Sequence, residues 1–229
     1  MQHDFSNWTL VFDLDGTLVE TAPDLHAALN HSLSSLGLGP VPLSEIRGMI
    51  GDGAKALIRK GLSWHDHPVD EALVTEEMWP VFLEHYLANI CRFSHLYEGA
   101  GDSLVALKAS GATLAVCTNK AQHLAEEVIK GLGLNSHFAA ILGGDAPTAQ
   151  KPDGRHILET IAFAGGDPGR AIMIGDSQTD ERAASDARLP FVFVRFGYGD
   201  RLGLDVPAFR QVGHWREMYA ALRDLTTEY

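Results

Sequence analysis

The order of apolar and polar positions changes once along the chain. From residue 19 to about residue 94, apolar residues recur at the spacing of a helix, and no strand-like run interrupts them. From Gly99 onward, helix-like segments alternate with short apolar runs at residues 113–117, 139–142, 171–174 and 191–194. The helix-like segments lie near residues 101–110, 121–132, 153–164, 178–188 and 215–225. This alternation predicts a parallel sheet with helices on both faces.

One more apolar run, Leu10–Phe12, stands before the all-helical stretch and adds a strand to the sheet. The simplest architecture is therefore α/β: a doubly wound, Rossmann-like parallel sheet with a helical cap domain inserted after its first strand. We expect residues 1–18 and 95–229 to form the core and residues 19–94 to form the cap.

Within the cap, the pattern predicts several separate helices. Thr21 has a hydroxyl that suits a helix N-cap, with a proline and an acid after it. Two short helices are expected near residues 43–49 and 54–62, and a longer helical pattern covers residues 70–90. Pro80 is expected to kink or split that last pattern, because proline cannot donate a backbone hydrogen bond.

Composition narrows the class of protein further. The 229 residues are 45% hydrophobic, which is enough for one large domain or for a core with an added module. The 18 basic and 30 acidic residues give a formal net charge of −12, which argues against nucleic acid as a partner. Cys91 and Cys117 have no metal-ligand spacing, and no apolar stretch reaches the length of about 18 residues that a membrane span requires. We expect a soluble cytoplasmic protein, a monomer or a homodimer, with no membrane partner.

Two acids follow the first strand directly. In Leu10-Val-Phe-Asp-Leu-Asp-Gly-Thr17, the alternation of side chains puts Asp13 and Asp15 on the same side. Two carboxylates about 4 Å apart repel each other by about 4 kcal/mol at an effective dielectric constant near 20. A bound Mg²⁺, a proton kept for acid–base work, or the use of one aspartate as a nucleophile would each explain the pair. A polar turn after a strand is the fourth alternative.

Three further strand ends carry polar residues, and parallel strands bring their carboxyl ends to one edge of a sheet. Thr118 offers a hydroxyl and a backbone N–H that suit a phosphate oxygen, or else it caps a helix. Lys151 would neutralise phosphate charge there, although a single lysine is usually a solvated surface residue. Asp176 and Asp180 stand one helical turn apart and would face one cation, or they stabilise the start of a helix.

Taken in chain order, these residues resemble the four motifs of the haloacid dehalogenase superfamily, in its phosphatase branch. The matching strings are Asp13-Leu-Asp-Gly-Thr17, Thr118, Lys151-Pro152 and Gly175-Asp176 with Asp180, and they extend over essentially the whole chain. The resemblance implies a magnesium-dependent phosphatase that forms an aspartyl-phosphate. It implies catalytic roles for Asp13 as nucleophile, Asp15 as general acid/base, Thr118 and Lys151. It implies the magnesium ligands Asp13, Asp15 and Asp176 with support from Asp180, and the phosphate contacts Thr118, Asn119 and Lys151.

A second resemblance points to the phosphoglycolate phosphatase group within this superfamily. It rests on Ile50-Gly-Asp-Gly53 and on Gly143-Gly-Asp145 ahead of Lys151-Pro-Asp-Gly154, where the group often has Lys-Pro-x-Pro. It implies that the partner is a small phosphorylated metabolite, with 2-phosphoglycolate the leading candidate. The possible cap contacts to its carboxylate are Arg47, Gly51, Gly53 and Lys55. Asp52 counts against this substrate unless its side chain points away.

Several other functions occur on related scaffolds. A sugar-phosphate phosphatase or a phosphomutase of the same superfamily keeps both acids and is separated only by its cap residues. Asp15 argues against dehalogenases, which do not need the second acid, and against phosphonatases, which usually lack it. A dinucleotide oxidoreductase needs Gly-x-Gly-x-x-Gly after the first strand, where this chain has Asp13-Leu-Asp-Gly16. The loss of any of the four motifs would favour a non-catalytic binding or regulatory protein, and none of them is lost.

Overall fold

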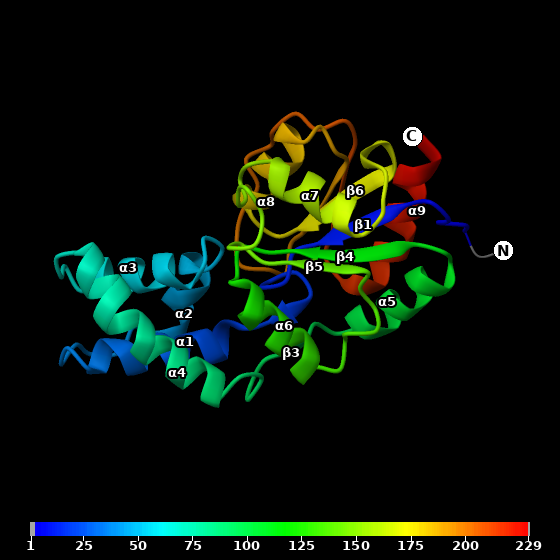
Figure 1. Cartoon of the computed structure of the whole chain (residues 1–229). Coiled ribbons are helices and arrows are strands. Elements are labelled where there is room, and N and C mark those ends of the chain that lie inside the picture. The colour runs from blue at the N-terminus through cyan, green and yellow to red at the C-terminus, as the bar shows by residue number, and fades with distance from the viewer. Residues whose placement is uncertain (1–2, 229) are drawn as a thin grey trace.

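The computed structural model describes residues 3–228 and contains a six-stranded sheet whose neighbouring strands are all parallel (Figure 1). The strands are β1 (Thr9–Phe12), β4 (Thr113–Cys117), β5 (Ala140–Leu142), β6 (Ala171–Gly175), β7 (Phe191–Val194) and β8 (Phe209–Val212). Their order is β5-β4-β1-β6-β7-β8, which confirms the predicted doubly wound sheet. Because the chain order reverses between β1 and β6, a ligand crevice is expected there, at the carboxyl edge.

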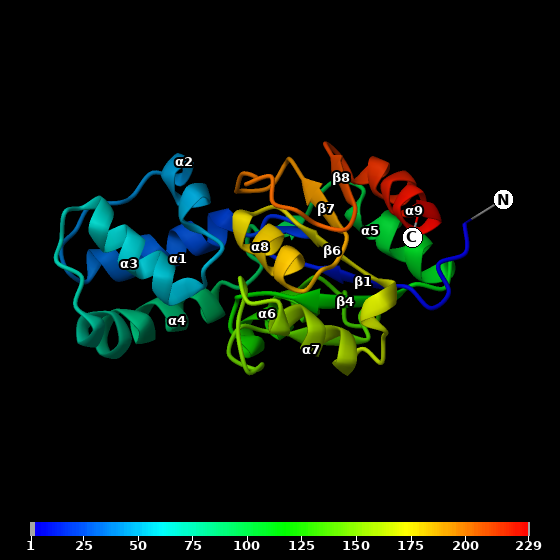
Figure 2. The same ribbon diagram turned by 90° about the horizontal axis from the view of Figure 1, so that it is seen from above.

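Helices cover both faces of this sheet (Figure 2). One face packs against α5, α6 and α9, and the other packs against α7 and α8. These helices are α5 (Ala100–Ala109), α6 (Gln122–Gly131), α7 (Arg155–Phe163), α8 (Gln178–Asp186) and α9 (Met218–Glu228). Along β1, Leu10 and Phe12 belong to the hydrophobic cluster under α5, α6 and α9, whereas Val11 belongs to the cluster under α7 and α8. Burial on both faces explains why the inner strands are continuous apolar runs rather than alternating ones.

The last part of the core differs from the predicted elements. The apolar-run pattern does not reveal β8, because Phe209-Arg-Gln-Val212 has two polar residues and only Val212 is buried. An edge strand has one unpaired side and less burial, which weakens its pattern. The predicted helix over residues 215–225 is in fact a 3-10 turn at Trp215–Glu217, followed by α9, which continues to Glu228.

The segment between β1 and α5 folds into a helical unit beside the carboxyl edge of the sheet (Figure 1). Its elements are α1 (Ala22–Ser34), α2 (Leu43–Ile46), a 3-10 helix (Arg47–Met49), α3 (Ala54–Trp64), a π-helix (Leu73–Met78) and α4 (Trp79–Ala88). Its buried residues, among them Leu29, Ile58 and Phe82, form a hydrophobic cluster of their own. Pro80 is the second residue of α4, directly after the π-helix, so the helical pattern is divided where we expect it.

Two short strands, β2 (Val19–Glu20) and β3 (His95–Leu96), pair antiparallel where the chain enters and leaves the helical unit. The expectation of an entirely helical stretch from residue 19 is therefore wrong at its first two residues, because a strand this short has no readable period. The pairing of β2 with β3 holds the two chain segments that link the helical unit to the core side by side. The boundaries of core and cap at residues 18/19 and 94/95 remain a prediction. None of the helices within residues 3–228 is long and apolar enough to cross a membrane.

Candidate active site

Polar residues from four connections meet at the carboxyl edge of the sheet. Asp13 follows β1, Thr118 follows β4, Lys151 lies on the connection after β5, and Asp176 follows β6. Because β1 and β6 are adjacent, Asp13 and Asp176 lie where the strand order reverses. All four side chains are buried. The structure therefore brings these predicted residues to one place, while their chemical roles remain proposals.

Lys151 is the positive charge at the centre of this arrangement. Its Nζ donates to Asp13 Oδ1 at 2.8 Å and to Asp180 Oδ1 at 2.6 Å, and its side chain is only 2% exposed. Asp180 is held from the other side by Ser177, whose backbone N–H and hydroxyl donate to Oδ2 at 3.0 and 2.6 Å. Ser177 and Asp180 form the capping box of α8, so the start of that helix fixes the carboxylate that receives Lys151.

Asp176 is oriented by two donors from distant parts of the chain. Its Oδ1 accepts from the Thr17 hydroxyl at 2.9 Å, and its Oδ2 accepts from the backbone N–H of Tyr198 at 2.7 Å. Gly16 leaves the necessary room, because a Cβ at this position, where φ is +92°, would come within 2.4 Å of Asp176 Oδ2. The Asp-Gly-Thr string after β1 therefore supplies both the space and one of the hydrogen bonds that position Asp176.

Three carboxylates in this site could hold a metal ion. Asp13, Asp176 and Asp180 each offer one oxygen, and these oxygens lie within 4.8 Å of one another. Burial raises the pKa of Asp13 to about 7 although Lys151 opposes the shift, and burial together with the neighbouring carboxylates raises the pKa of Asp176. Three acids against one lysine leave negative charge that a divalent cation would offset. The all-oxygen set fits Mg²⁺.

The carboxylate of Asp15 has other partners and lies outside that group. Lys120 Nζ stands 3.0 Å from Asp15 Oδ1 and 3.1 Å from Oδ2, and the hydroxyl of Thr21 donates to Oδ1 at 2.6 Å. The expectation that the Thr21 side chain caps α1 is therefore wrong, because its hydroxyl is turned toward Asp15 instead. The sequence pattern assigns no role to Lys120. The available signal was its place in the string Thr118-Asn-Lys120 at a strand end.

Thr118 and Asn119 are only partly available to a phosphate group. The backbone N–H of Thr118 donates to the carbonyl of Leu142 at 3.0 Å, so the expected backbone donor is used by the sheet and the hydroxyl remains. The ladder between β4 and β5 continues one residue past β4, and α6 begins only at Gln122. Asn119 Nδ2 donates to the carbonyls of Gly51 at 3.1 Å and Lys151 at 2.9 Å, which ties the helical unit to the core.

A narrow cavity lies between the strand ends and the helical unit. It leaves about 30 Å³ for the centres of water-sized molecules. Its lining combines polar groups of the core with glycines and apolar residues of the helical unit: Asp13, Asp15, Leu25, Ile50, Gly51, Gly53, Ala54, Leu57, Thr118, Asn119, Lys120 and Leu124. Gly51 and Gly53 therefore lie where a molecule bound to Asp13 would meet the helical unit.

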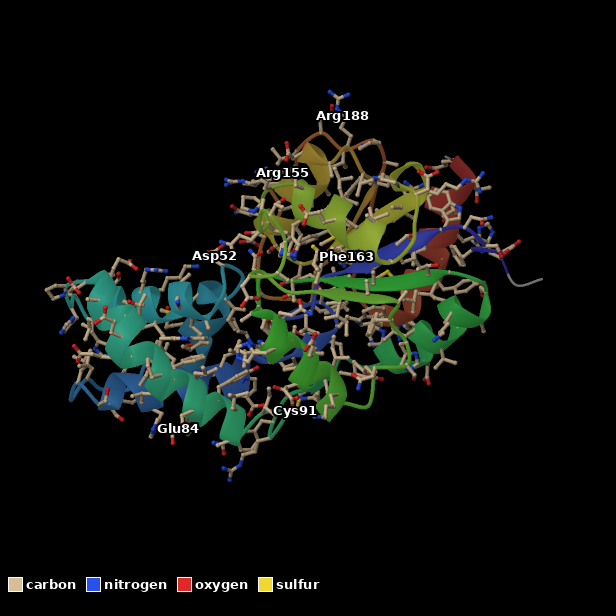
Figure 3. All side chains as sticks on the ribbon, viewed as in Figure 1. Asp52, Glu84, Cys91, Arg155, Phe163 and Arg188 are labelled. Atoms are coloured by element: carbon tan, nitrogen blue, oxygen red, sulfur yellow. The ribbon has the colours of Figure 1, made fainter. Side chains whose placement is uncertain are left out.

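Arg47 and Lys55, the two charged residues among the predicted cap contacts, do not line this cavity. Arg47 Nη2 pairs with Glu20 at 2.8 Å, and Lys55 lies over a tryptophan ring of α4. Asp52, labelled in Figure 3, pairs with Lys60 at 2.7 Å and also does not line the cavity. The repulsion that Asp52 would exert on a substrate carboxylate is therefore reduced. Contacts from Arg47 and Lys55 to a substrate remain a prediction.

Comparison with known proteins identifies the family. The model of the family described as haloacid dehalogenase-like hydrolase matches residues 10–194, which is most of the chain. The chain belongs to this family. The predicted resemblance to the superfamily is thereby confirmed, and so is the predicted enzyme class, a hydrolase of the phosphatase type.

Relatives of this hydrolase carry one recurring name. A phosphoglycolate phosphatase of Agrobacterium fabrum is 44% identical over 190 residues, which cover 83% of this chain and 81% of the relative. A phosphoglycolate phosphatase of Caulobacter vibrioides is 42% identical over 208 residues, with 89% and 87% covered. Among solved structures, a predicted phosphoglycolate phosphatase of Haemophilus somnus 129PT superposes with a TM-score of 0.82 at 27% identity, and 94% and 97% of the two chains are covered.

In this haloacid dehalogenase-like hydrolase, a buried histidine supports the connection that carries Lys151. The Nδ1 atom of His156 accepts from the backbone N–H of Lys151 at 3.2 Å, and Nε2 donates to the carbonyl of Leu142 at 3.2 Å. The first contact needs the neutral ring, because a proton on Nδ1 would break it, whereas Nε2 donates in either protonation state. Burial, helped by the charge of Lys151, lowers the pKa of His156 to about 4.

The free energy of unfolding is therefore expected to depend on pH through His156. The folded pKa lies below the unfolded value of about 6.5, so the contribution is complete above pH 6.5 and is lost as the pH falls toward 4. The shift corresponds to about 3 kcal/mol. The measurement is urea unfolding of the protein and of His156→Gln between pH 4 and 7.5. The free energy of unfolding of the unchanged protein should exceed that of His156→Gln by less at pH 4 than at pH 7.5, with most of the ~3 kcal/mol lost. A difference in free energy that does not change with pH would show that His156 is not the group responsible.

Proposed function

We propose that this hydrolase is a magnesium-dependent phosphatase that cleaves a small phosphate monoester through an aspartyl-phosphate on Asp13, with 2-phosphoglycolate as the preferred substrate. The observation that carries the proposal is the position of Asp13. Its carboxylate is buried at the reversal of strand order, receives Lys151 at 2.8 Å, and belongs to the oxygen cluster with Asp176 and Asp180.

In the first step, an oxygen of Asp13 attacks phosphorus and the bond between phosphorus and the leaving oxygen breaks. Asp15 gives its proton to that oxygen, so an alcohol leaves and Asp15 becomes a carboxylate. In the second step, water attacks the phosphorus of the aspartyl-phosphate while Asp15 takes a proton from the water. The bond to Asp13 then breaks, and inorganic phosphate is released.

Charge stabilisation is the main task of the surrounding residues. Lys151 is proposed to bind the phosphoryl oxygens together with the Thr118 hydroxyl and Asn119. Asp13, Asp176 and the backbone carbonyl of Asp15 are proposed to hold Mg²⁺, with Asp180 in support. When bound, the ion would offset the negative charge of the carboxylates and of the phosphoryl group.

Two observations favour 2-phosphoglycolate over larger esters. The cavity is small, and its helical side is formed by Gly51 and Gly53, whose backbone can approach a short carboxylate closely. The relatives at 44% and 42% identity are named phosphoglycolate phosphatases.

The test is a comparison of kcat/KM for 2-phosphoglycolate, glucose 6-phosphate and adenosine monophosphate, with magnesium and with a chelator. Hydrogen bonds from the backbone of Gly51 and Gly53 to the charged carboxylate should favour 2-phosphoglycolate by about 10- to 100-fold. The chelator should remove turnover of all three esters. Equal or higher rates on the sugar phosphate would support a sugar-phosphate phosphatase or phosphomutase instead. Turnover of none of them would support a non-catalytic binding protein, and rates that survive the chelator would exclude the metal.

A further inference from the structure

Lys120 connects the predicted acid–base carboxylate to the helical unit. Its Nζ lies within 3.0 and 3.1 Å of the two oxygens of Asp15, and 5.0 Å from the centre of the Tyr86 ring. Asp15 and Lys120 belong to the core connections after β1 and β4, whereas Tyr86 belongs to α4. The ammonium group is therefore held between a carboxylate of one unit and an aromatic ring of the other.

All of this contact is shielded from water. The side chain of Lys120 is 4% exposed, that of Asp15 is 12% exposed, and Tyr86 is fully buried. Burial by itself lowers the pKa of Lys120, but the charge of Asp15 and the contact with Tyr86 outweigh this and raise it. Burial also raises the pKa of Tyr86 to about 12, so a neutral ring faces the ammonium group. Buried charges interact more strongly than charges on the surface, so the position of the Asp15 carboxylate depends on the Lys120 ammonium group.

We propose that Lys120 is the positioning residue for Asp15 and that Tyr86, from the helical unit, holds Lys120 in place. The proposal rests on the proposed function, in which Asp15 is the acid and base. Without Lys120, the hydrogen bond from Thr21 would be the remaining restraint on the Asp15 carboxylate among the contacts of residues 3–228.

The consequence for the reaction lies in the proton transfer. As the proton moves from Asp15 to the leaving oxygen, Asp15 becomes negative and Lys120 stabilises the carboxylate with both of its oxygens in contact. The same contact sets the direction from which Asp15 later receives a proton from water. Because Tyr86 lies on α4, the packing of the helical unit against the core also determines how Asp15 is oriented.

A competing role for Lys120 has to be separated from this one. Lys120 also lines the cavity, where an ammonium group could bind the carboxylate of a substrate directly. Three substrates distinguish the two roles. 2-Phosphoglycolate and ethyl phosphate both release an alkoxide that needs a proton, but only the first has a carboxylate. p-Nitrophenyl phosphate releases a stabilised phenolate that leaves without protonation.

The first experiment measures kcat/KM of Lys120→Met on these three substrates, because this ratio reports the formation of the aspartyl-phosphate and not its later hydrolysis, which also uses Asp15 and is common to all three. We expect losses of about 100-fold on both 2-phosphoglycolate and ethyl phosphate, and of less than about threefold on p-nitrophenyl phosphate. Lys120→Arg should recover to within about tenfold of the unchanged protein on the alkyl esters, because its guanidinium also reaches both carboxylate oxygens. A loss confined to 2-phosphoglycolate would identify a substrate-binding lysine, and an equal loss on all three would identify a structural one; both results overturn the proposal.

Two further variants serve as references. Lys130→Met removes an exposed lysine from α6 and should change none of the rates. Asp15→Asn should show the same preference for p-nitrophenyl phosphate as Lys120→Met. If Asp15→Asn lacks that preference, the proposed acid–base role of Asp15 fails. If Asp15→Asn shows it and Lys120→Met does not, only the role of Lys120 fails.

The second experiment tests the part played by Tyr86. Tyr86→Phe keeps the ring and should keep the kcat/KM values of the unchanged protein, whereas Tyr86→Leu should lower kcat/KM on the alkyl esters only. Phe82→Leu removes another buried ring of α4 and should leave the ratio between the substrates unchanged. In the double variant with Lys120→Met, Tyr86→Leu should add less than about twofold, because both act through one contact. Additive losses, or an altered ratio in Phe82→Leu, would overturn the link to the helical unit.

Discussion

Replacing Asp13 with asparagine is expected to stop turnover, with a loss of kcat on the order of 10⁴-fold or more, since removal of a nucleophile is among the largest single effects in enzymes. An amide oxygen is a poor nucleophile and cannot form the aspartyl-phosphate. The fold should persist, because the substitution keeps the shape of the side chain and removes one of three clustered carboxylates. The measurement is kcat on 2-phosphoglycolate together with the melting temperature in metal-free buffer, which should not fall.

A matched change elsewhere in the core separates chemistry from general damage. Asp153, two residues after Lys151, is a partly exposed carboxylate that pairs with the exposed Arg155 at 2.7 Å. Asp153→Asn should keep both activity and stability, because exposed ion pairs contribute little. If Asp13→Asn retained more than about a tenth of the activity, Asp13 would not be the nucleophile, whatever happened to the second variant.

Replacing Lys151 with methionine is expected to reduce both activity and stability. The proposed phosphate contact would be lost, which should lower kcat/KM by about 10²- to 10³-fold. Asp13 and Asp180 would also lose the ammonium group that lies 2.8 and 2.6 Å from them. Breaking a buried ion pair in this way costs about 3–5 kcal/mol, and the 2% exposure of the lysine side chain leaves little solvent screening. Urea unfolding at pH 7.5 in metal-free buffer measures this loss.

A double variant tells the two effects of Lys151→Met apart. Adding Asp180→Asn removes one of the carboxylates left unpaired, so the free energy of unfolding should recover by about half or more while kcat/KM stays low. Lys130→Met, an exposed lysine in an i,i+3 pair with Glu127, is the control and should change neither quantity. Normal stability of Lys151→Met would show that the contacts of Lys151 with Asp13 and Asp180 contribute nothing to the fold.

The active site illustrates how far strand-end residues can be interpreted without coordinates. Asp13, Thr118 and Asp176 each follow an apolar run, and parallel strands necessarily end at one edge. Their assembly could therefore be predicted. The orientation of each side chain could not: the Thr118 N–H is used by the sheet, and Thr21 donates to Asp15 instead of capping its helix.

The pattern of apolar and polar residues was enough to predict the alternation of strands and helices, the helical stretch after the first strand, and the residues that would share one edge of the sheet. These properties follow from local burial, which leaves a period in the sequence. Three features could be found only in the folded protein: β2 pairs with β3, β8 joins the edge of the sheet, and Lys120 lies between Asp15 and Tyr86. Such contacts join residues that are far apart in the chain, and their geometry depends on how the helical unit packs on the core. No local pattern of apolar and polar residues records that packing.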